Sequence, residues 1–272
     1  MFRFDKGEYI IGMDINDFII KEDEKPLDRL VDDGGFCAIF RTIACIGDSL
    51  SSGEFESKTA DGKREFHDMF EYSWGQFLGR ICGSKVYNFS RGGMTAKEYM
   101  ESFAENNGFW DKDKLAQAYI IALGVNDITK TEGKLGAISD VDLNDWKNNN
   151  KTFAGYYAQI IARIKELQPR AKIFLMTIPR NGGELDKARK DHRDILEGFT
   201  RIFDNTYLID LYTYSPVQDK VFGDNFWLGH MTPTGYVLMS KMIGSYIDYI
   251  IRANPKDFNQ VGFIGTDLYY EK

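Results

Sequence analysis

The sequence predicts an α/β protein of three layers, with a five-stranded parallel sheet between two layers of helices. The first observation is a set of short apolar runs with the length and composition of buried strands, at residues 43–46, 86–89, 118–123, 172–178 and 207–211. Stretches with helical spacing separate these runs, and strands that alternate with helices form parallel sheets. Glycine or proline follows several of the runs and marks where each strand ends.

The helices are expected between these strands, and the strongest of them covers residues 153–168. Its apolar side chains recur at Tyr157, Ile160, Ile161, Ile164 and Leu167, and Pro169 ends it. The other expected helices cover residues 74–81, 94–103, 186–203 and 233–251. The polar segments 51–70 and 215–232 are expected to be loops.

We expect a domain over residues 41–272, preceded by an extension or cap over residues 1–40. Short strands are expected at residues 8–14 and 17–20 of this extension. A chain of 272 residues suits a single α/β domain with insertions.

Composition excludes several classes of function. The net charge of −7 and the lack of a basic cluster argue against nucleic-acid binding. Apolar runs fall short of the roughly 20 residues that a membrane span requires. The first residues, Met1 to Glu8, are too acidic for a signal peptide, so a cytoplasmic location is expected. The oligomeric state is left open.

Cysteine and histidine usage gives no metal signature. The chain has an odd number of cysteines, namely Cys37, Cys45 and Cys82, and they lack metal-ligand spacing. Cys45 and Cys82 are expected in the core. The three histidines lack zinc-site spacing. We therefore expect neither a metal nor a cofactor.

Gly47-Asp48-Ser49-Leu50 follows the first predicted strand and contains a candidate nucleophile. A serine in a turn after a buried strand lies at the carboxyl edge of the sheet, where open α/β folds bind ligands. Such a serine is also common as a helix cap, so this motif is weak by itself.

Three later stretches strengthen the interpretation: Asn88 to Thr95, Leu123 to Asp127, and Gly229 to Tyr236. Together with Gly47-Asp48-Ser49-Leu50 and in this order, they resemble the SGNH, or GDSL-type, family of esterases and lipases. The resemblance extends from about Thr42 to Ile251. It implies a flavodoxin-like strand order of 2-1-3-4-5.

The resemblance also implies roles for four residues. Ser49 would be the nucleophile and His230 its general base, because a serine hydroxyl needs a base near neutral pH. The backbone N–H groups of Ser49 and Gly93 and the side-chain amide of Asn126 would form the oxyanion hole. The other two histidines, His67 and His192, are expected at the surface.

One position departs from the family pattern. The family usually carries an aspartate three residues before the histidine, and this chain has Trp227 there. We expect a main-chain carbonyl, most simply that of Trp227, to orient His230. Asp224, six residues before His230, is the alternative.

The sequence therefore predicts a serine esterase for a small-molecule ester with a short acyl group, acetylated carbohydrate among the candidates. Phe222, Phe226 and Trp227 either stack on a sugar ring or pack in the core. Two alternatives stay open, a catalytically inactive carbohydrate-binding protein and an acyltransferase that uses the same Ser–His pair.

Overall fold

The computed structural model describes residues 14–270, and its main sheet has five parallel strands. The strand order is β4-β1-β5-β6-β7, which is the expected 2-1-3-4-5 order of the core strands. This confirms the predicted three-layer α/β fold. The bounds are β1 (Thr42–Gly47), β4 (Lys85–Ser90), β5 (Ala118–Ala122), β6 (Lys172–Met176) and β7 (Thr206–Ile209).

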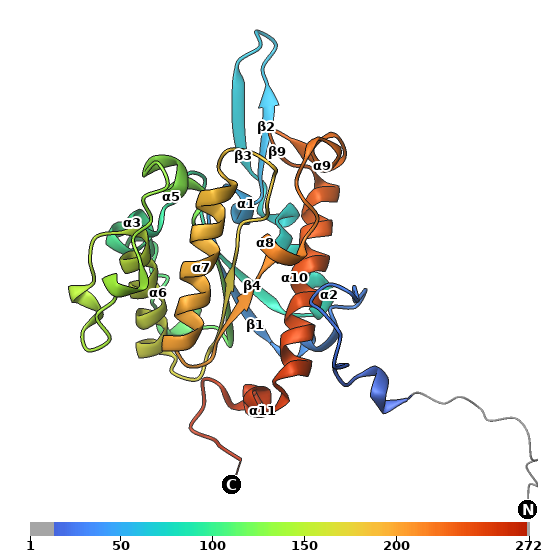
Figure 1. Ribbon diagram of the computed structural model, residues 1–272, viewed down its shortest axis with the longest axis vertical. Helices are drawn as coiled ribbons and strands as arrows, with labels where there is room; N and C mark the ends of the chain where they lie inside the picture. Colours follow the sequence, from blue (N-terminus) through green and yellow to red (C-terminus); the bar gives the residue numbers. More distant parts are fainter. Residues whose placement is uncertain (1–13, 271–272) are drawn as a thin grey trace, which may run out of the picture.

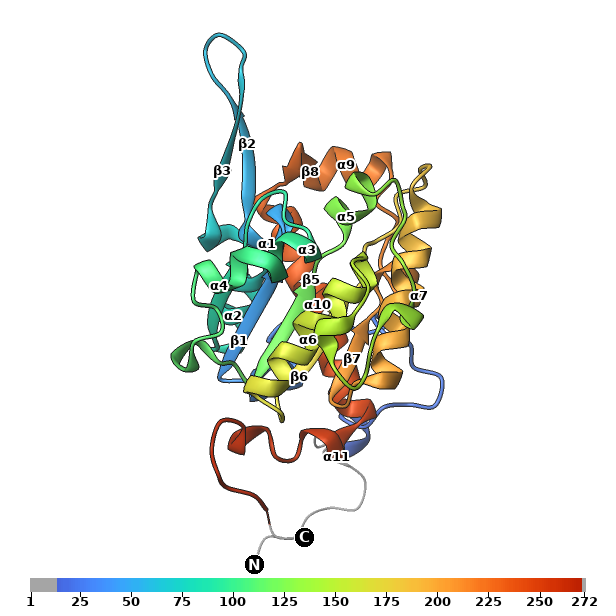
Figure 2. The ribbon, with the colours of Figure 1, turned by 90° about the vertical axis from the view of Figure 1, so that its left-hand side faces the viewer.

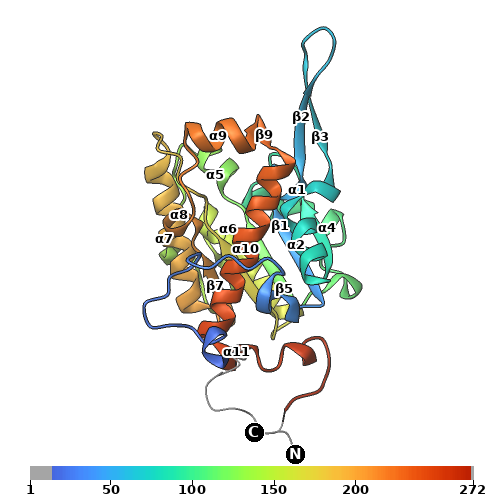
Figure 3. The same ribbon diagram turned by 90° about the vertical axis from the view of Figure 1, so that its right-hand side faces the viewer.

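Helices cover both faces of the sheet (Figures 2 and 3). The longest are α2 (Trp74–Cys82), α6 (Phe153–Leu167), α7 (Asp186–Ile202) and α10 (Pro233–Ala253), close to their expected positions. Residues 96–106 are also helical, as α3 (Ala96–Glu98), a π-helical turn (Tyr99–Phe103) and α4 (Ala104–Asn106). The shorter helices are α1 (Ser49–Ser52), α5 (Val125–Lys130), α8 (Leu211–Tyr214), α9 (Lys220–Phe226) and α11 (Pro255–Phe258).

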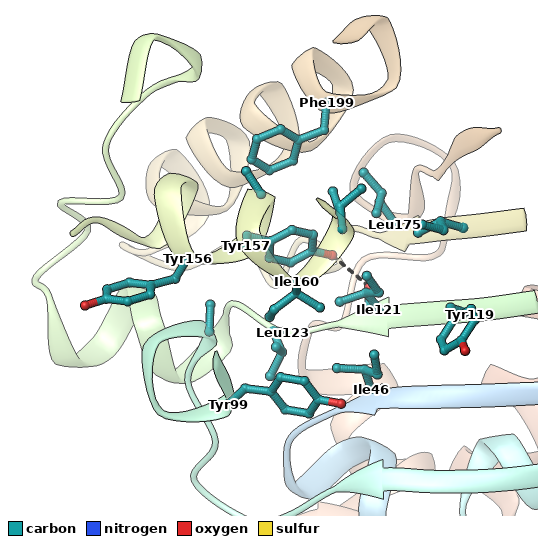
Figure 4. Close-up of a cluster of buried hydrophobic side chains, with 14 of the residues drawn as sticks. Ile46, Tyr99, Tyr119, Ile121, Leu123, Tyr156, Tyr157, Ile160, Leu175 and Phe199 are labelled. Carbon is teal, nitrogen blue, oxygen red and sulfur yellow. Dashed lines mark hydrogen bonds between the residues drawn. The ribbon is translucent and has the colours of Figure 1, made fainter. Parts of the chain in front are cut away.

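Each face of the sheet carries its own hydrophobic core. On one face, strand residues such as Ile121 and Leu175 pack against α6 and α7, where Tyr157 and Phe199 are fully buried (Figure 4). The Tyr157 hydroxyl donates a hydrogen bond of 3.0 Å to the Ile121 carbonyl, which satisfies the polar end of this buried ring. On the other face, α2 and α10 cover the sheet. The two cores hold the strand ends, and hence the loops that follow them, in fixed positions.

The segment before the sheet differs from expectation. Residues 17–20 form the end of a 3-10 turn (Ile15–Asp17) and a bend, so the strand expected there is wrong. The strand expected at 8–14 lies almost entirely outside the described residues. Residues 14–40 run along α10, where the Val31 N–H donates to Ser245 Oγ and Arg252 pairs with Glu24. The division of the chain at residue 40 stays a prediction.

Two segments expected to be loops contain secondary structure. Residues 54–68 form an antiparallel hairpin of β2 (Glu54–Lys58) and β3 (Arg64–Asp68), which projects from the body of the molecule (Figure 1). The segment before α10 contains α9 and a second, very short hairpin of β8 (Trp227–Leu228) and β9 (His230–Met231). Figure 1 and the contacts between strands place β2 beside β9.

Among residues 14–270, no helix combines the length and apolar character needed to cross a membrane. Cys37, Cys45 and Cys82 are buried free thiols, which confirms that Cys45 and Cys82 are core residues.

Candidate active site

Ser49 lies at the carboxyl end of β1, in the first turn of α1. Asp48 caps this helix, and its side chain accepts the Leu50 N–H at 3.0 Å. Gly47 permits the tight turn, because a Cβ there would lie 2.2 Å from Ser51 Oγ. The Gly-Asp-Ser motif thus directs the Ser49 side chain to the edge of the sheet where open α/β folds bind ligands.

His230 is placed by the β8–β9 hairpin and by the start of α10. Gly229 forms the turn with a φ of 73°, a conformation that favours glycine. Thr232 then caps α10 by accepting the Gly235 N–H at 3.2 Å. These two short-range constraints fix the backbone on either side of the histidine.

The fold brings Ser49 and His230 together as expected. Ser49 Oγ and His230 Nε2 are 3.0 Å apart, although 181 residues separate them in sequence. At this distance the imidazole can accept the hydroxyl proton when the oxygen attacks a carbonyl.

The partner of His230 Nδ1 is neither of those expected from the sequence. Glu56 Oε1 lies 2.9 Å from Nδ1. Asp224 instead pairs with Lys220, and its side chain is 60% exposed. The expectations of a Trp227 carbonyl and of Asp224 are therefore both wrong, because the hairpin supplies a carboxylate from another part of the chain.

A second carboxylate from the hairpin lies on the other side of the ring. Glu54 Oε1 is 3.1 Å from His230 Nε2, the nitrogen that also contacts Ser49. Burial, the largest cause, raises the pKa of Glu54 above its ordinary value; the His230 charge opposes this, whereas Asp68 and Glu56 add to it. His230 therefore lies between two carboxylates and one hydroxyl.

Strand alternation explains why both glutamates face the histidine. Residues two apart on a strand share a face, so Glu54 and Glu56 point to one side while Phe55 points to the other. Phe55 packs against Tyr236 of α10 and Tyr72, which attaches the base of the hairpin to the body. The available sequence signal was Asp61-Gly62, a dipeptide typical of hairpin turns, between alternating residues.

The groups expected in the oxyanion hole lie at neighbouring strand ends. Among residues 14–270, the backbone N–H groups of Ser49 and Gly93 have no acceptor. A Cβ on Gly93 would meet nothing within 4 Å, so the space above this residue is open. Asn126 Nδ2 is 3.1 Å from the Met94 carbonyl and 3.3 Å from Asp48 Oδ2, a long and weak contact. The oxyanion-hole roles of Ser49, Gly93 and Asn126 stay a prediction.

A mainly apolar cavity of about 190 Å³ opens beside Ser49 and His230. Its apolar walls come from several elements: Leu50, Trp74, Val125, Met176, Ile178, Pro179, Trp227, Met231 and Met239. Of the aromatic residues considered for sugar stacking, Trp227 lines this cavity, whereas Phe222 is buried against Phe226.

The other two histidines lie elsewhere. His67 on β3 is exposed, as expected, and bonds Ser57 Oγ at 2.7 Å. His192 was expected at the surface, and this is wrong, because its side chain is fully buried on α7. Its Nε2 donates to the Leu123 carbonyl at 3.0 Å, and burial lowers its pKa to about 4. A neutral imidazole thus supports the end of β5, next to the turn that contains Asn126.

In the part of the chain that the structure describes, no three His, Cys, Asp or Glu side chains are grouped so as to bind a metal ion.

A serine beside a histidine at the carboxyl edge of a parallel α/β sheet is the arrangement of the serine hydrolases. The sequence profile of the GDSL-like lipase/acylhydrolase family matches residues 45–238. The chain belongs to this family, which confirms the resemblance. Comparison with curated proteins gives no match.

Several solved structures share the fold at low sequence identity. A family two carbohydrate esterase from Clostridium thermocellum, in complex with cellohexaose, is 20% identical with a TM-score of 0.56, over 78% of this chain and 64% of its own. A family 3 carbohydrate esterase from the same organism is 14% identical with a TM-score of 0.51, and the match covers 78% of this chain and 97% of the esterase. A family two carbohydrate esterase from Cellvibrio japonicus is 15% identical with a TM-score of 0.55, and the match covers 78% of this chain and 61% of the esterase.

Proposed function

We propose that this protein is a serine esterase that hydrolyses a small carboxylic ester through an acyl-enzyme. The observation that carries the proposal is the 3.0 Å contact between Ser49 Oγ and His230 Nε2, at the sheet edge where the N–H groups of Ser49 and Gly93 have no acceptor among residues 14–270. A nucleophile, a base and oxyanion donors at one strand edge are the parts that acyl transfer requires.

In the first half-reaction Ser49 Oγ attacks the ester carbonyl, and its proton moves to His230 Nε2. The carbonyl oxygen becomes an oxyanion that accepts the N–H groups of Ser49 and Gly93, with the Asn126 amide as the third donor. Collapse of this intermediate breaks the bond to the alkoxy oxygen, which leaves with the proton from His230. In the second half-reaction water attacks the acyl-enzyme, His230 takes its proton, and Ser49 recovers a proton as the acid leaves.

The acyl group is proposed to be short and to occupy the cavity beside Ser49. Its mainly apolar walls favour an alkyl chain, although Arg189, Gln218 and Thr177 also line the cavity. Trp227 at the edge of the cavity offers a flat surface to a sugar ring in the alcohol part of the ester. Acetylated carbohydrate is a candidate substrate, and two of the structural neighbours are carbohydrate esterases.

The first test measures hydrolysis of p-nitrophenyl esters by the wild type and by Ser49→Ala. We expect the variant to lose activity without a change in melting temperature, because a half-buried hydroxyl is removed and no packing is disturbed. A fluorophosphonate probe should label the wild type and leave Ser49→Ala unlabelled. Equal labelling of both proteins would contradict the role of Ser49.

A series of p-nitrophenyl esters from acetate to octanoate then tests the acyl part. We expect kcat/KM to rise from acetate to about butyrate or hexanoate and then to fall, because each buried methylene contributes about 0.8 kcal/mol until the cavity is full. A steady fall from acetate onward would restrict the acyl group to acetyl. Product analysis with added alcohol separates hydrolysis from acyl transfer.

A further inference from the structure

We infer that the β2–β3 hairpin completes the catalytic machinery, with Glu56 as the carboxylate that positions His230 and with Arg64 holding Glu56. The inference rests on the proposed esterase function and deepens it. It assigns the orienting role to a residue that follows the nucleophile by seven positions, far in sequence from the histidine.

The contacts of Glu56 suit this role. Its two oxygens have separate partners, since Oε1 is 2.9 Å from His230 Nδ1 and Oε2 is 3.0 Å from Arg64 Nε. The Glu56 side chain is 11% exposed and that of His230 is 17% exposed, so water has little access to the bond between them. A carboxylate with both oxygens engaged keeps one orientation.

The neighbouring backbone is shaped to admit this carboxylate. A Cβ at Gly229 would lie 2.2 Å from Glu56 Cδ, so a larger residue beside His230 would collide with the glutamate. Phe66, which pairs with Glu56 across the hairpin, places its ring edge-on to the imidazole at 6.2 Å between centroids. The hairpin thus contacts His230 through two adjacent cross-strand residues.

Glu56 favours a hydrogen on Nδ1. An ionised carboxylate only accepts hydrogen bonds, so the Nδ1–H donates to Glu56, and the lone pair of Nε2 then faces Ser49, with Glu54 Oε1 as a second neighbour at 3.1 Å. When Nε2 takes the serine proton, the positive imidazole lies against the negative Glu56. The proton on Nδ1 stays there throughout, and Glu56 acts through His230 without touching substrate.

The experiment compares Glu56→Gln with two matched controls, Glu65→Gln and Asp224→Asn. Glu65 lies on the same hairpin and faces away from His230, while Asp224 is the acid that sequence spacing suggests. We expect Glu56→Gln to lower kcat by about 10³–10⁴ with KM within threefold, because the amide can hold the wrong tautomer. Both controls should keep kcat within twofold of the wild type.

Glu56→Asp tests the carboxylate itself. It keeps the charge on a shorter side chain, and we expect it to recover at least tenfold over Glu56→Gln. Formate added to Glu56→Ala should also restore part of the activity. Arg64→Gln should lower kcat only two- to fivefold, because this ion pair is partly exposed.

A measurement without turnover separates this inference from the proposed function. The Nδ1 proton of His230 should give a low-field proton resonance in the wild type that Glu56→Gln loses and Glu65→Gln keeps. If the wild type hydrolyses no ester yet shows this pattern, the proposed function fails and the positioning role stands. An unchanged resonance in a folded Glu56→Gln, or a kcat within tenfold of the wild type, would overturn the inference.

Discussion

At the scale of single residues, the site is defined by what surrounds His230. Three oxygens lie within 3.1 Å of its ring nitrogens, from Ser49, Glu54 and Glu56. A neutral imidazole has one N–H and one lone pair, so it cannot satisfy both carboxylates and accept from Ser49 at the same time. The protonation state of the site is therefore set by the competition at Nε2 between Glu54 and the serine.

Glu54→Gln tests this competition through the pH dependence of catalysis. Burial raises the pKa of Glu54, so this carboxylate takes up a proton at a higher pH than an ordinary glutamate, and the loss of its charge contributes to the acidic limb of the kcat/KM profile. Glu54→Gln lacks this titrating group, so we expect the acidic limb to move to lower pH, with the plateau rate lowered less than tenfold. Other titratable or charged groups that interact with His230, Glu54 or Glu56 include Asp48, Arg64 and Asp68, and all of them remain in the variant together with Glu56. A limb that stays in place, or moves to higher pH, would contradict this role of Glu54.

Asn126 is the expected oxyanion donor whose amide already has partners. Its Nδ2 contacts the Met94 carbonyl and, more weakly, Asp48 Oδ2. The contact with Asp48 Oδ2 is long, at 3.3 Å, and a developing oxyanion is a strong hydrogen-bond acceptor. The Asn126 amide can therefore give up its hydrogen bond to Asp48 and donate to the oxyanion of the intermediate.

We expect Asn126→Ala to lower kcat by about 10²–10³ with little change in KM, since the amide acts on charge that forms only during the reaction. Steady-state kinetics on one p-nitrophenyl ester give both constants. A change confined to KM would show that Asn126 binds substrate without stabilising the oxyanion.

At the scale of secondary-structure elements, the hairpin divides into a base and a projecting part. The base carries Glu54, Phe55 and Glu56, which contact the body, and the distal residues 57–65 are largely exposed. Glu56 and Phe66 are directly paired, so a two-residue Asn-Gly turn can join them and replace residues 57–65.

This shortened hairpin should remain an active enzyme. It retains Glu54 and Glu56 and loses Arg64, so we expect kcat/KM to fall less than about tenfold. Replacing residues 54–68 by Gly-Ser should lower it by about 10³ or more. The chain can close this gap, because the Met69 N–H already bonds the Gly53 carbonyl at 2.9 Å. Equal losses in the two deletions, with unchanged melting temperatures, would assign the essential contacts to the distal part.

The elements also show which features could be read from the sequence. The five sheet strands are apolar runs that end in glycine, proline or a polar turn, because they are covered on both faces. The hairpin escaped detection because it projects into solvent, where charged residues obscure the two-residue alternation around Phe55 and Phe66. Ser49 and His230 could be predicted because each lies in one of the short ordered motifs that carry the family resemblance. Glu56 was missed because its role depends on a contact across 174 residues.

At the scale of the whole molecule, three buried titratable groups act on stability in opposite directions. Burial, the main cause, raises the pKa of Asp48 to about 7 and that of Asp127 to about 6, from 3.8. The native state binds their protons more tightly than the unfolded state, so these two groups make the protein less stable as pH rises from about 4 to 7. His192 has the opposite effect, because its native pKa is below its unfolded value.

Buried His192 makes the native protein lose stability in acid. The unfolded chain binds a proton at His192 below pH 6.5, whereas the native chain stays neutral there down to about pH 4. As pH falls through this window the unfolded state gains protons that the native state cannot accept, so stability is lost. At pH 4.5 the loss is about 3 kcal/mol of unfolding free energy. His192→Gln keeps a donor for the Leu123 carbonyl and removes the titration.

Urea unfolding of the wild type and of His192→Gln at pH 7.5 and pH 4.5 measures the difference directly. The variant should be the less stable protein at pH 7.5, because it leaves space beside Phe153 and Gly124. Between pH 7.5 and pH 4.5 the difference in unfolding free energy between the two proteins should change by about 3 kcal/mol in favour of the variant, so that it closes or reverses at pH 4.5. Asp48 and Asp127 titrate equally in both proteins, so their contributions cancel in the comparison. A gap of the same size at both pH values would mean that His192 is protonated in the folded protein and not held neutral by burial.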